Sequence, residues 1–422
     1  MATPAPHLTA LRPRVVVAFL GTWVLALLAA NLVPVMIGAL VADLGFDISA
    51  AAGLATAMSL GTAAGIFATN TVVARFSRPL LARIGLSILV SGFGLAALTM
   101  TATAVSLGVI VGGVGAGITV SAATAASAAT EDPDKTSSVV MIANRLFAAL
   151  LLAVIPVLGQ NLRLILAVPA VLGLAGLLTA GGLPSLRKTP GTVPTPAAAV
   201  VDVPTPADAD SPERKGKATR IGGLAIVLAL VFGLWSMTED MVYAMTELLA
   251  TTHVGLAPEQ SSLLISLNIV GGLAGALLAP IALRTIGRSW SIFGIVLVSS
   301  VSKFLIVTTT APGVYAVAIV VWGVMYGAVL SLVFALAARM DISGRSVALV
   351  SGVYITGIAL GPVVGGVLIE NVGLLEFGLL AAIPSLVFGA ALLIVSRRSG
   401  VSEHGGAQTA PAEPVNVMEE AK

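Results

Sequence analysis

The chain has 422 residues, of which 57% are hydrophobic and only 10% charged, and its formal net charge is +2. A soluble globular protein carries about 25% charged residues, so this composition excludes that class and predicts an integral membrane protein. The absence of cysteine excludes disulfides and thiol chemistry, and the three histidines are too scattered for a metal site.

Twelve apolar runs are long enough to cross a bilayer, since a spanning helix needs about 20 apolar residues. They lie at 15–42, 48–71, 79–100, 105–129, 137–159, 163–183, 220–250, 260–283, 290–310, 313–338, 346–369 and 376–396. The first run is too long for the apolar part of a signal peptide, and eleven others follow it. We therefore expect it to be a retained helix.

The stretch between the sixth and seventh runs differs in composition. Residues 184–219 are rich in Pro, Ala, Thr and Asp and lack periodic apolar spacing, which predicts a disordered linker. We expect an all-α membrane protein of two six-helix bundles. Its parts would be a cytoplasmic N-terminus (1–14), a first bundle (15–183), a cytoplasmic linker (184–219), a second bundle (220–396) and a disordered cytoplasmic tail (397–422).

The basic residues lie almost entirely on one side of the predicted membrane. If the N-terminus is cytoplasmic, all but three of the 22 Lys and Arg residues fall in cytoplasmic segments. The exceptions are Arg163 on the opposite side, and Arg145 and Lys303 within spans. The positive-inside rule then places both termini in the cytoplasm. We expect a multi-pass protein of a bacterial plasma membrane that works as a monomer.

The second half of the chain resembles the first when it is shifted by 210 residues. Matched basic residues accompany matched glycines at this shift, with Lys135 meeting Arg345. The matched glycine pairs are Gly45/Gly255, Gly61/Gly271, Gly65/Gly275, Gly113/Gly323 and Gly117/Gly327. Two six-helix repeats in parallel topology are typical of transporters whose site lies at the repeat interface.

Two loops carry related basic motifs. ARFSRPLLARIG (74–85) follows the second span, and RTIGRSW (284–290) follows the eighth. Both resemble the cytoplasmic loop signature of the major facilitator superfamily, whose usual form is G-x-L-A-D-R-x-G-R-R, although Ala74 replaces the family Asp. The matching residues, for which the resemblance implies a gating role, are Arg75, Arg78, Gly287 and Arg288.

A third motif lies in the eleventh predicted span. GIALGPVVGG (357–366) matches the superfamily's antiporter motif G-x-x-x-G-P-x-x-G-G letter for letter, although the family usually carries it in helix five. Small residues four apart allow close helix packing, and a proline removes a backbone donor and can bend the helix. The motif residues are Gly357, Gly361, Pro362, Gly365 and Gly366.

The arrangement of six plus six spans, the two basic loop motifs and the glycine–proline motif together resemble the twelve-helix drug or metabolite:proton antiporters of this superfamily. The resemblance implies two bundles that rock around a central site for a small organic solute. Protons would be the coupling ion and the lipid bilayer the surrounding medium. It implies no cofactor, no metal and no nucleic-acid partner.

Two adjacent carboxylates in the seventh span are candidates for proton coupling. An ionisable residue at the membrane centre costs at least about 2.5–3.5 kcal/mol on insertion scales. Glu239 and Asp240 lie about 100° apart around the helix, so both can border one cavity. Burial and mutual repulsion raise the proton affinity of a carboxylate. Direct binding of a cationic substrate, or a wet vestibule without specific function, remain alternatives.

Two other charged residues have simpler expected roles. Glu247 lies about 18 Å outward of the middle of its helix, so we expect a solvated helix end. Lys303 lies in the ninth span, which is peripheral in the family. We expect its side chain to extend toward the outer membrane surface.

Arg145, in the fifth span, has three open roles. It could hold a substrate anion, pair with Glu239, or bond to neighbouring carbonyls or Asn144. The family's central helices carry further polar and aromatic candidates for the substrate-binding wall. These are Asn31, Trp235, Tyr243, Asn268, Tyr326 and Tyr354, with Trp23 and Trp322 beside them.

The expected function is therefore secondary active transport of a small organic solute by alternating access, as proton-coupled efflux. A proton-independent facilitator or uptake carrier on the same fold is the alternative. A membrane receptor or an enzyme is disfavoured, because the sequence has no nucleotide loop G-x-x-x-x-G-K, no H-E-x-x-H and no soluble catalytic domain.

Overall fold

The computed structural model describes residues 8–184 and 223–398, apart from 71, 74, 160 and 341–344. In this part of the chain, twelve helical segments are long and apolar enough to cross a membrane. The predicted all-α membrane fold is thus confirmed. The predicted linker (184–219) and tail (397–422) fall almost wholly outside the described residues.

The first half opens with a broken span. It consists of α1 (Pro13–Phe19), the π-helical turn η1 (Leu20–Val24), α2 (Leu25–Asn31) and α3 (Val33–Leu44). The sequence predicts one helix over 15–42, but the helix is interrupted at Leu32 because Pro34 has no backbone N–H to donate. The remaining helices are α4 (Ile48–Asn70), α5 (Arg78–Thr99), α6 (Ala102–Ser127), α7 (Pro133–Val154), η2 (Ile155–Leu158), α8 (Leu162–Thr179) and η3 (Ala180–Gly182).

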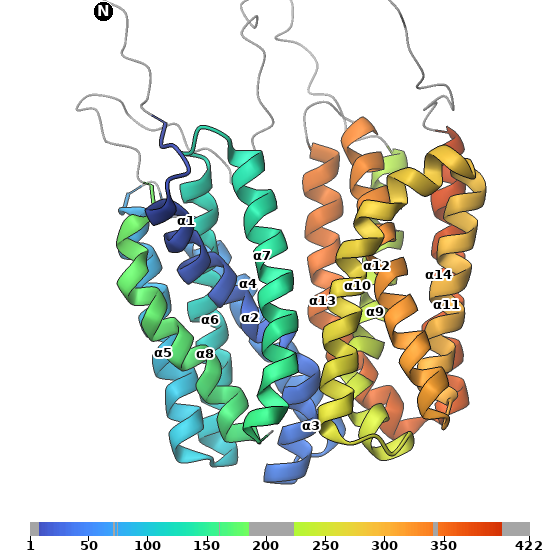
Figure 1. Ribbon diagram of the computed structural model, residues 1–422, viewed down its shortest axis with the longest axis horizontal. Coiled ribbons are helices and arrows are strands. Elements are labelled where there is room, and N and C mark those ends of the chain that lie inside the picture. Colours follow the sequence, from blue (N-terminus) through green and yellow to red (C-terminus); the bar gives the residue numbers. More distant parts are fainter. Residues whose placement is uncertain are drawn as a thin grey trace, which may run out of the picture.

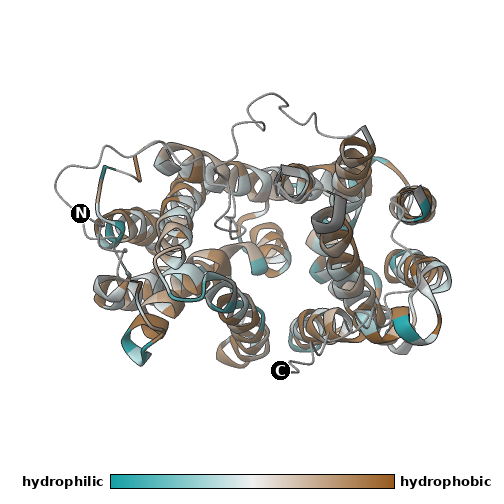
Figure 2. Ribbon diagram, turned by 90° about the horizontal axis from the view of Figure 1, so that it is seen from above, coloured by the Kyte–Doolittle hydropathy of each residue, from teal (hydrophilic) through white to brown (hydrophobic). Residues whose placement is uncertain are grey.

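The second half supplies six further spans. They are α9 (Gly223–Leu248) with the π-helical turn η5 (Leu249–His253), α10 (Pro258–Thr285), α11 (Arg288–Thr308), α12 (Pro312–Met340), α13 (Arg345–Asn371) and α14 (Leu374–Arg398). Figures 1 and 2 show the helices of the two halves as two bundles side by side. Large apolar side chains such as Leu98 and Leu178 are exposed on the outward faces, as a lipid-facing surface requires.

The alternation of helix directions defines two ends of the molecule. We call the end that holds residues 8–12, 75–77 and 128–132 the basic end, which lies at the top of Figure 1. The opposite end, which holds the turns at 45–47 and 254–257, is called the far end. Both names refer to positions in the molecule and not to sides of the membrane.

Matched glycines make matched packing contacts in the two halves. A side chain at Gly117 of α6 would overlap the carbonyl oxygen of Thr62 in α4. A side chain at Gly327 of α12 would overlap the carbonyl oxygen of Gly272 in α10. Both partners in each contact are related by the same shift of 210 residues. The repeat in the sequence therefore corresponds to a repeated helix contact, in which backbones approach too closely for any Cβ atom.

Hydrogen bonds between the bundles lie toward the far end. Ser266 Oγ on α10 donates to the Ala149 carbonyl on α7 at 2.7 Å. The Val363 amide on α13 donates to Thr56 Oγ1 on α4 at 3.1 Å. The Ser49 amide at the start of α4 donates to Glu370 on α13 at 3.0 Å. Each contact lies on the half of its helices nearer the far end, so the two bundles are joined there.

Candidate functional site

Glu239 forms a buried ion pair inside the second bundle. Its Oε1 lies 2.7 Å from Nζ of Lys303 on α11, and the two residues are 2% and 0% exposed. The Trp322 indole on α12 donates to Glu239 Oε2 at 2.5 Å. Lys303 also donates to Thr238 at 3.3 Å and to Ser385 on α14. Glu239 on α9 thus contacts α11 and α12, and Lys303 connects these helices to α14.

This pair corrects the expectation that Lys303 extends to the outer membrane surface. A side chain on a peripheral helix can also point inward, and it does so here because Glu239 offers a counter-charge at the same depth. A buried charge is tolerated when it is paired and its other hydrogen-bonding atoms are satisfied. The pair also means that Glu239 takes its cation from Lys303 rather than from Arg145.

Glu247 is likewise not the solvated helix end that the sequence suggests. It is only 2% exposed, and it accepts a hydrogen bond from Ser261 Oγ on α10 at 2.5 Å. Its side chain packs beside Gly38 on α3 of the first bundle. The first bundle covers this carboxylate at the far end. The position of Glu247 along its own helix does not reveal this cover, because the covering residues belong to other helices.

Asp240 has different surroundings from Glu239. It is half-buried on α9, and Arg145 on α7 of the opposite bundle lies within electrostatic range of it. Among the described residues, neither of the two forms an ion pair within 4.0 Å. A carboxylate and a guanidinium from opposite bundles therefore lie within electrostatic range of one another without forming an ion pair.

Aromatic side chains of the second bundle adjoin these charges. Tyr326 and Tyr354 share a hydrogen bond of 2.5 Å between their hydroxyls, and both lie within electrostatic range of Arg145. Trp235 stacks on Tyr326 at 5.6 Å between ring centroids. Its indole nitrogen is buried and has no hydrogen-bond partner in the described structure. Tyr326 and Tyr354 are thus half-buried beside these charges, whereas Trp235 packs behind them inside the second bundle rather than on the substrate-binding wall that the sequence predicts.

Asn31 and Tyr243 connect the two bundles beside this group. The Tyr243 hydroxyl on α9 donates to the Asn31 carbonyl at 3.2 Å, directly before the break in the first span. The Asn31 side chain donates to Asn144 at 3.4 Å, and Asn144 donates to the Val24 carbonyl at 3.3 Å. Asn144 is therefore hydrogen-bonded within its own bundle, next to the link from Asn31 to Tyr243.

The glycine–proline motif lies where α13 meets both α9 and the first bundle. A Cβ atom added to Gly361 would lie 2.6 Å from Cβ of Asp240, and Gly365 packs on Met241 in the same way. Gly366 faces Ala52 on α4 of the first bundle. The motif therefore packs directly against Asp240 on one side and against the joined far end on the other.

The remaining candidates lie away from the seam charges. Asn268 is buried within its own bundle and donates to the Ile319 carbonyl at 2.8 Å. Arg75 is exposed at the basic end, and Arg78 begins α5 with one buried guanidinium nitrogen that has no partner among the described residues. Gly287 has a φ of 86°, a backbone conformation that favours glycine, and it precedes Arg288 at the start of α11.

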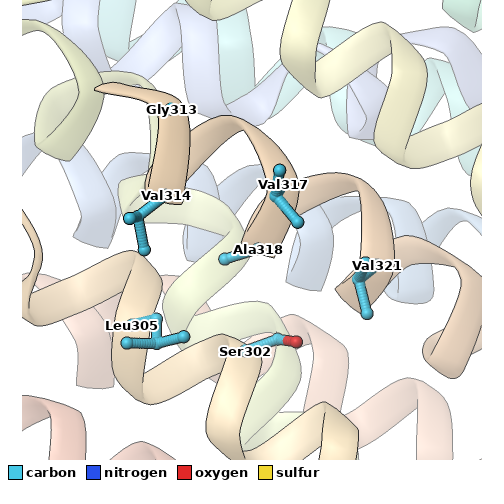
Figure 3. Close-up of a pocket in the computed structure, with 7 residues that line it drawn as sticks. All are labelled: Ser302, Leu305, Gly313, Val314, Val317, Ala318 and Val321. Atoms are coloured by element: carbon cyan, nitrogen blue, oxygen red, sulfur yellow. The ribbon is translucent and has the colours of Figure 1, made fainter. Parts of the chain in front are cut away.

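A pocket between α11 and α12 belongs to the lipid-facing surface. Figure 3 shows its lining, which is apolar except for the hydroxyl of Ser302. Val317 on its rim is 64% exposed. The sequence neighbours Lys303 and Trp322 are buried on the inner side of the same helices. The pocket therefore lies outside the charged seam.

Two helical bundles that meet at a seam lined by charged and aromatic side chains are the architecture of a membrane transporter. The sequence matches the Major Facilitator Superfamily over residues 18–341, and the chain belongs to this superfamily. It is thus a member of a transporter family and not of an enzyme family. Comparison with curated proteins gives no match to the sequence.

Solved structures with similar folds are also transporters. The nucleoside transporter NupG is 15% identical, with a TM-score of 0.66 over 92% of this chain and 100% of that one. A D-xylose-proton symporter is 16% identical, with a TM-score of 0.63 over 91% and 96%. The peptide transporter POT, in complex with sulfate, is 12% identical, with a TM-score of 0.67 over 94% and 97%. At these identities, the likeness shows the fold alone.

Proposed function

We propose that the chain is a secondary active transporter that exports a small organic solute in exchange for protons, by alternating access. The observation that carries this proposal is the placement of Asp240 and Arg145, which are half-buried on opposite bundles and lie within electrostatic range of one another without forming an ion pair. Glu239 beside them already has a cation. The seam therefore keeps one carboxylate available to exchange a proton.

In this proposal, the adjacent carboxylates Glu239 and Asp240 have different roles. Glu239 stays paired with Lys303 and holds α9 in place, while Asp240 alternately binds and releases the proton. The groups that act on Asp240 are Glu239 on its own helix and Arg145 across the seam. Asp240 in turn lies within electrostatic range of the hydroxyls of Tyr243, Tyr326 and Tyr354. Occupancy by a proton or by solute changes the local charge, which biases the packing of the bundles.

The path from Asp240 to the far end runs along α13. Gly361 packs on Asp240, and Gly366 packs on α4 of the opposite bundle. Glu370, one turn further, accepts a hydrogen bond from the Ser49 amide at the start of α4, at 3.0 Å. A shift of α13 against α9 would therefore disturb the contacts that join the far end. The resemblance of this motif to the antiporter motif is our reason for favouring efflux.

We further propose that both termini are cytoplasmic in a bacterial plasma membrane, and that the monomer is functional. The support is the concentration of Lys and Arg residues at the basic end. With this orientation, the contacts at the far end would close the route to the outside.

The proposal is tested with proteoliposomes that contain a pH-sensitive dye. A panel of small organic solutes is added outside, and the internal pH is recorded. Exchange of solute for protons predicts that the interior becomes alkaline with at least one solute, and that empty liposomes do not respond. Acidification would instead indicate uptake together with protons. Solute entry without any pH change would indicate a proton-independent facilitator and would contradict the proposal.

A further inference from the structure

The charges at the seam that do not belong to the buried Glu239–Lys303 pair indicate the class of substrate. Glu239 and Lys303 neutralise one another inside the second bundle. Arg145 of the first bundle and Asp240 of the second are both half-buried and lie within electrostatic range of one another. The Arg145 guanidinium is always cationic. The seam therefore presents one positive and one negative charge on opposite walls.

These two charges do not satisfy one another directly. They lie within electrostatic range, but no ion pair joins them within 4.0 Å. A solute that carries only a positive charge would be repelled by Arg145, and one that carries only a negative charge would be repelled by ionised Asp240. A solute with one charge of each sign satisfies both walls. Guanidinium groups bind carboxylates well because their planar donors match the two oxygens.

The wall beside the charges is aromatic. Phe232 stacks on Tyr354 at 4.9 Å between ring centroids, and Trp235 stacks on Tyr326 at 5.6 Å. The hydroxyls of Tyr326 and Tyr354 lie within electrostatic range of Arg145. Phe232 and Trp235 are buried behind Tyr354 and Tyr326, which are themselves half-buried, so a flat apolar body can pack on the two tyrosine rings only. The same wall could interact with an ammonium group near Asp240 through the ring faces.

We infer that the transported solute is a zwitterion with an apolar or aromatic body, of the amino-acid type, whose carboxylate binds Arg145 and whose ammonium group binds Asp240. This inference rests on the proposed function and deepens it. Asp240 cannot hold a proton and a solute ammonium group at once. Binding of the solute from one side therefore releases the proton, which is the exchange that antiport requires.

Three probes of matched shape test the inference. L-phenylalanine carries both charges, 3-phenylpropanoate lacks the ammonium group, and 2-phenylethylamine lacks the carboxylate. Their affinities for the purified full chain in lipid nanodiscs are measured by calorimetry. Each charged hydrogen bond is expected to contribute about tenfold or more in affinity, so L-phenylalanine should bind at least about tenfold more tightly than either singly charged probe.

Two variants give opposite patterns if the inference is correct. Arg145→Gln should weaken L-phenylalanine and 3-phenylpropanoate but not the amine. Asp240→Asn should weaken L-phenylalanine and the amine but not the acid. Arg163→Gln and Glu259→Gln remove exposed charges near the far end and serve as matched controls that leave all three affinities unchanged. If Arg145→Gln does not fold, Arg145→Lys keeps the charge without the planar donors and should bind the carboxylate probes with intermediate affinity.

Three results would overturn the inference: a singly charged probe that binds as tightly as L-phenylalanine, equal weakening of all three probes by both variants, or no binding of any probe. Equilibrium binding needs no proton gradient. A failure of proton exchange in liposomes would therefore contradict the proposed function and leave this result standing. A chain that exchanges protons but binds a different class of solute would contradict this inference alone.

Discussion

Replacement of Lys303 by methionine should strongly destabilise the protein. The ammonium group is fully buried, lies 2.7 Å from Glu239, and also donates to Thr238 and Ser385. Methionine fills a similar volume but leaves the Glu239 carboxylate buried without a cation. Removal of one partner from a buried pair costs about 3–5 kcal/mol, because an uncompensated charge remains. We expect a loss of this size in the free energy of unfolding.

The assay is unfolding of the purified protein in mixed micelles, followed by its tryptophan fluorescence. The double variant with Glu239→Gln removes both charges and should recover most of the loss, to within about 2 kcal/mol of the unmodified protein. Lys135→Met at the exposed start of α7 is the matched control and should change stability by less than about 0.5 kcal/mol. A loss below about 1 kcal/mol for Lys303→Met, or a double variant no more stable than the single one, would refute the buried pair.

Three smaller predictions concern the contacts around this pair and along α13. Trp322→Phe removes one hydrogen bond to the Glu239 carboxylate and should lower the free energy of unfolding by about 1.5–3 kcal/mol in the same assay. Gly361→Ala places a methyl group 2.6 Å from Asp240 Cβ and should destabilise by about 1–3 kcal/mol. Gly352→Ala on the same helix, where no atom lies within 4 Å of the added methyl, should be neutral or stabilising by up to about 1 kcal/mol. Glu370→Gln removes a carboxylate from the start of α4 and should raise the population separated at the far end by about two- to fivefold. Spin-label distances between cysteines introduced at exposed Ala50 and Asn371 would measure that population without background labelling, because the chain has no native cysteine.

The fold could be predicted from the sequence because the membrane constrains it so strongly. Apolar runs of the required length gave the number of spans and their approximate bounds. The broken first span was not predicted, although Pro34 was visible as a residue that cannot donate to the preceding turn. Its consequence depends on Tyr243 of the other bundle, which bonds to the Asn31 carbonyl beside the break. Such a contact between bundles has no local signal.

The candidate site could be predicted only in part. The sequence identifies Glu239 and Asp240 as costly residues, but it cannot say which of them has a partner inside its own bundle. A signal for the Lys303 pair was present in the depths of the two residues. Glu239 lies about 6 Å outward of the middle of its predicted span, and Lys303 lies about 4–5 Å outward of its own. Two opposite charges at similar depths in one bundle are better explained as a pair than as separate exposed groups.

Glu247 illustrates a different limit. Depth along one helix places it near the membrane surface, where a carboxylate is inexpensive. In the structure it is buried because Gly38 of α3 and Ser261 of α10 cover it. Burial at the far end depends on how closely the two bundles approach there. That approach is a property of the assembled fold and not of the periodicity of a single span.

The Asp240→Asn variant tests most directly whether Asp240 carries the coupled proton. Variant and unmodified protein are reconstituted into liposomes, and solute exchange and internal pH are recorded together for a solute that the unmodified protein exchanges for protons. At a saturating solute concentration, which offsets the weaker binding expected for Asp240→Asn, we predict that the variant still exchanges labelled for unlabelled solute but no longer moves protons, while the exposed control Glu259→Gln moves both. Proton movement by Asp240→Asn at the unmodified rate would contradict the account.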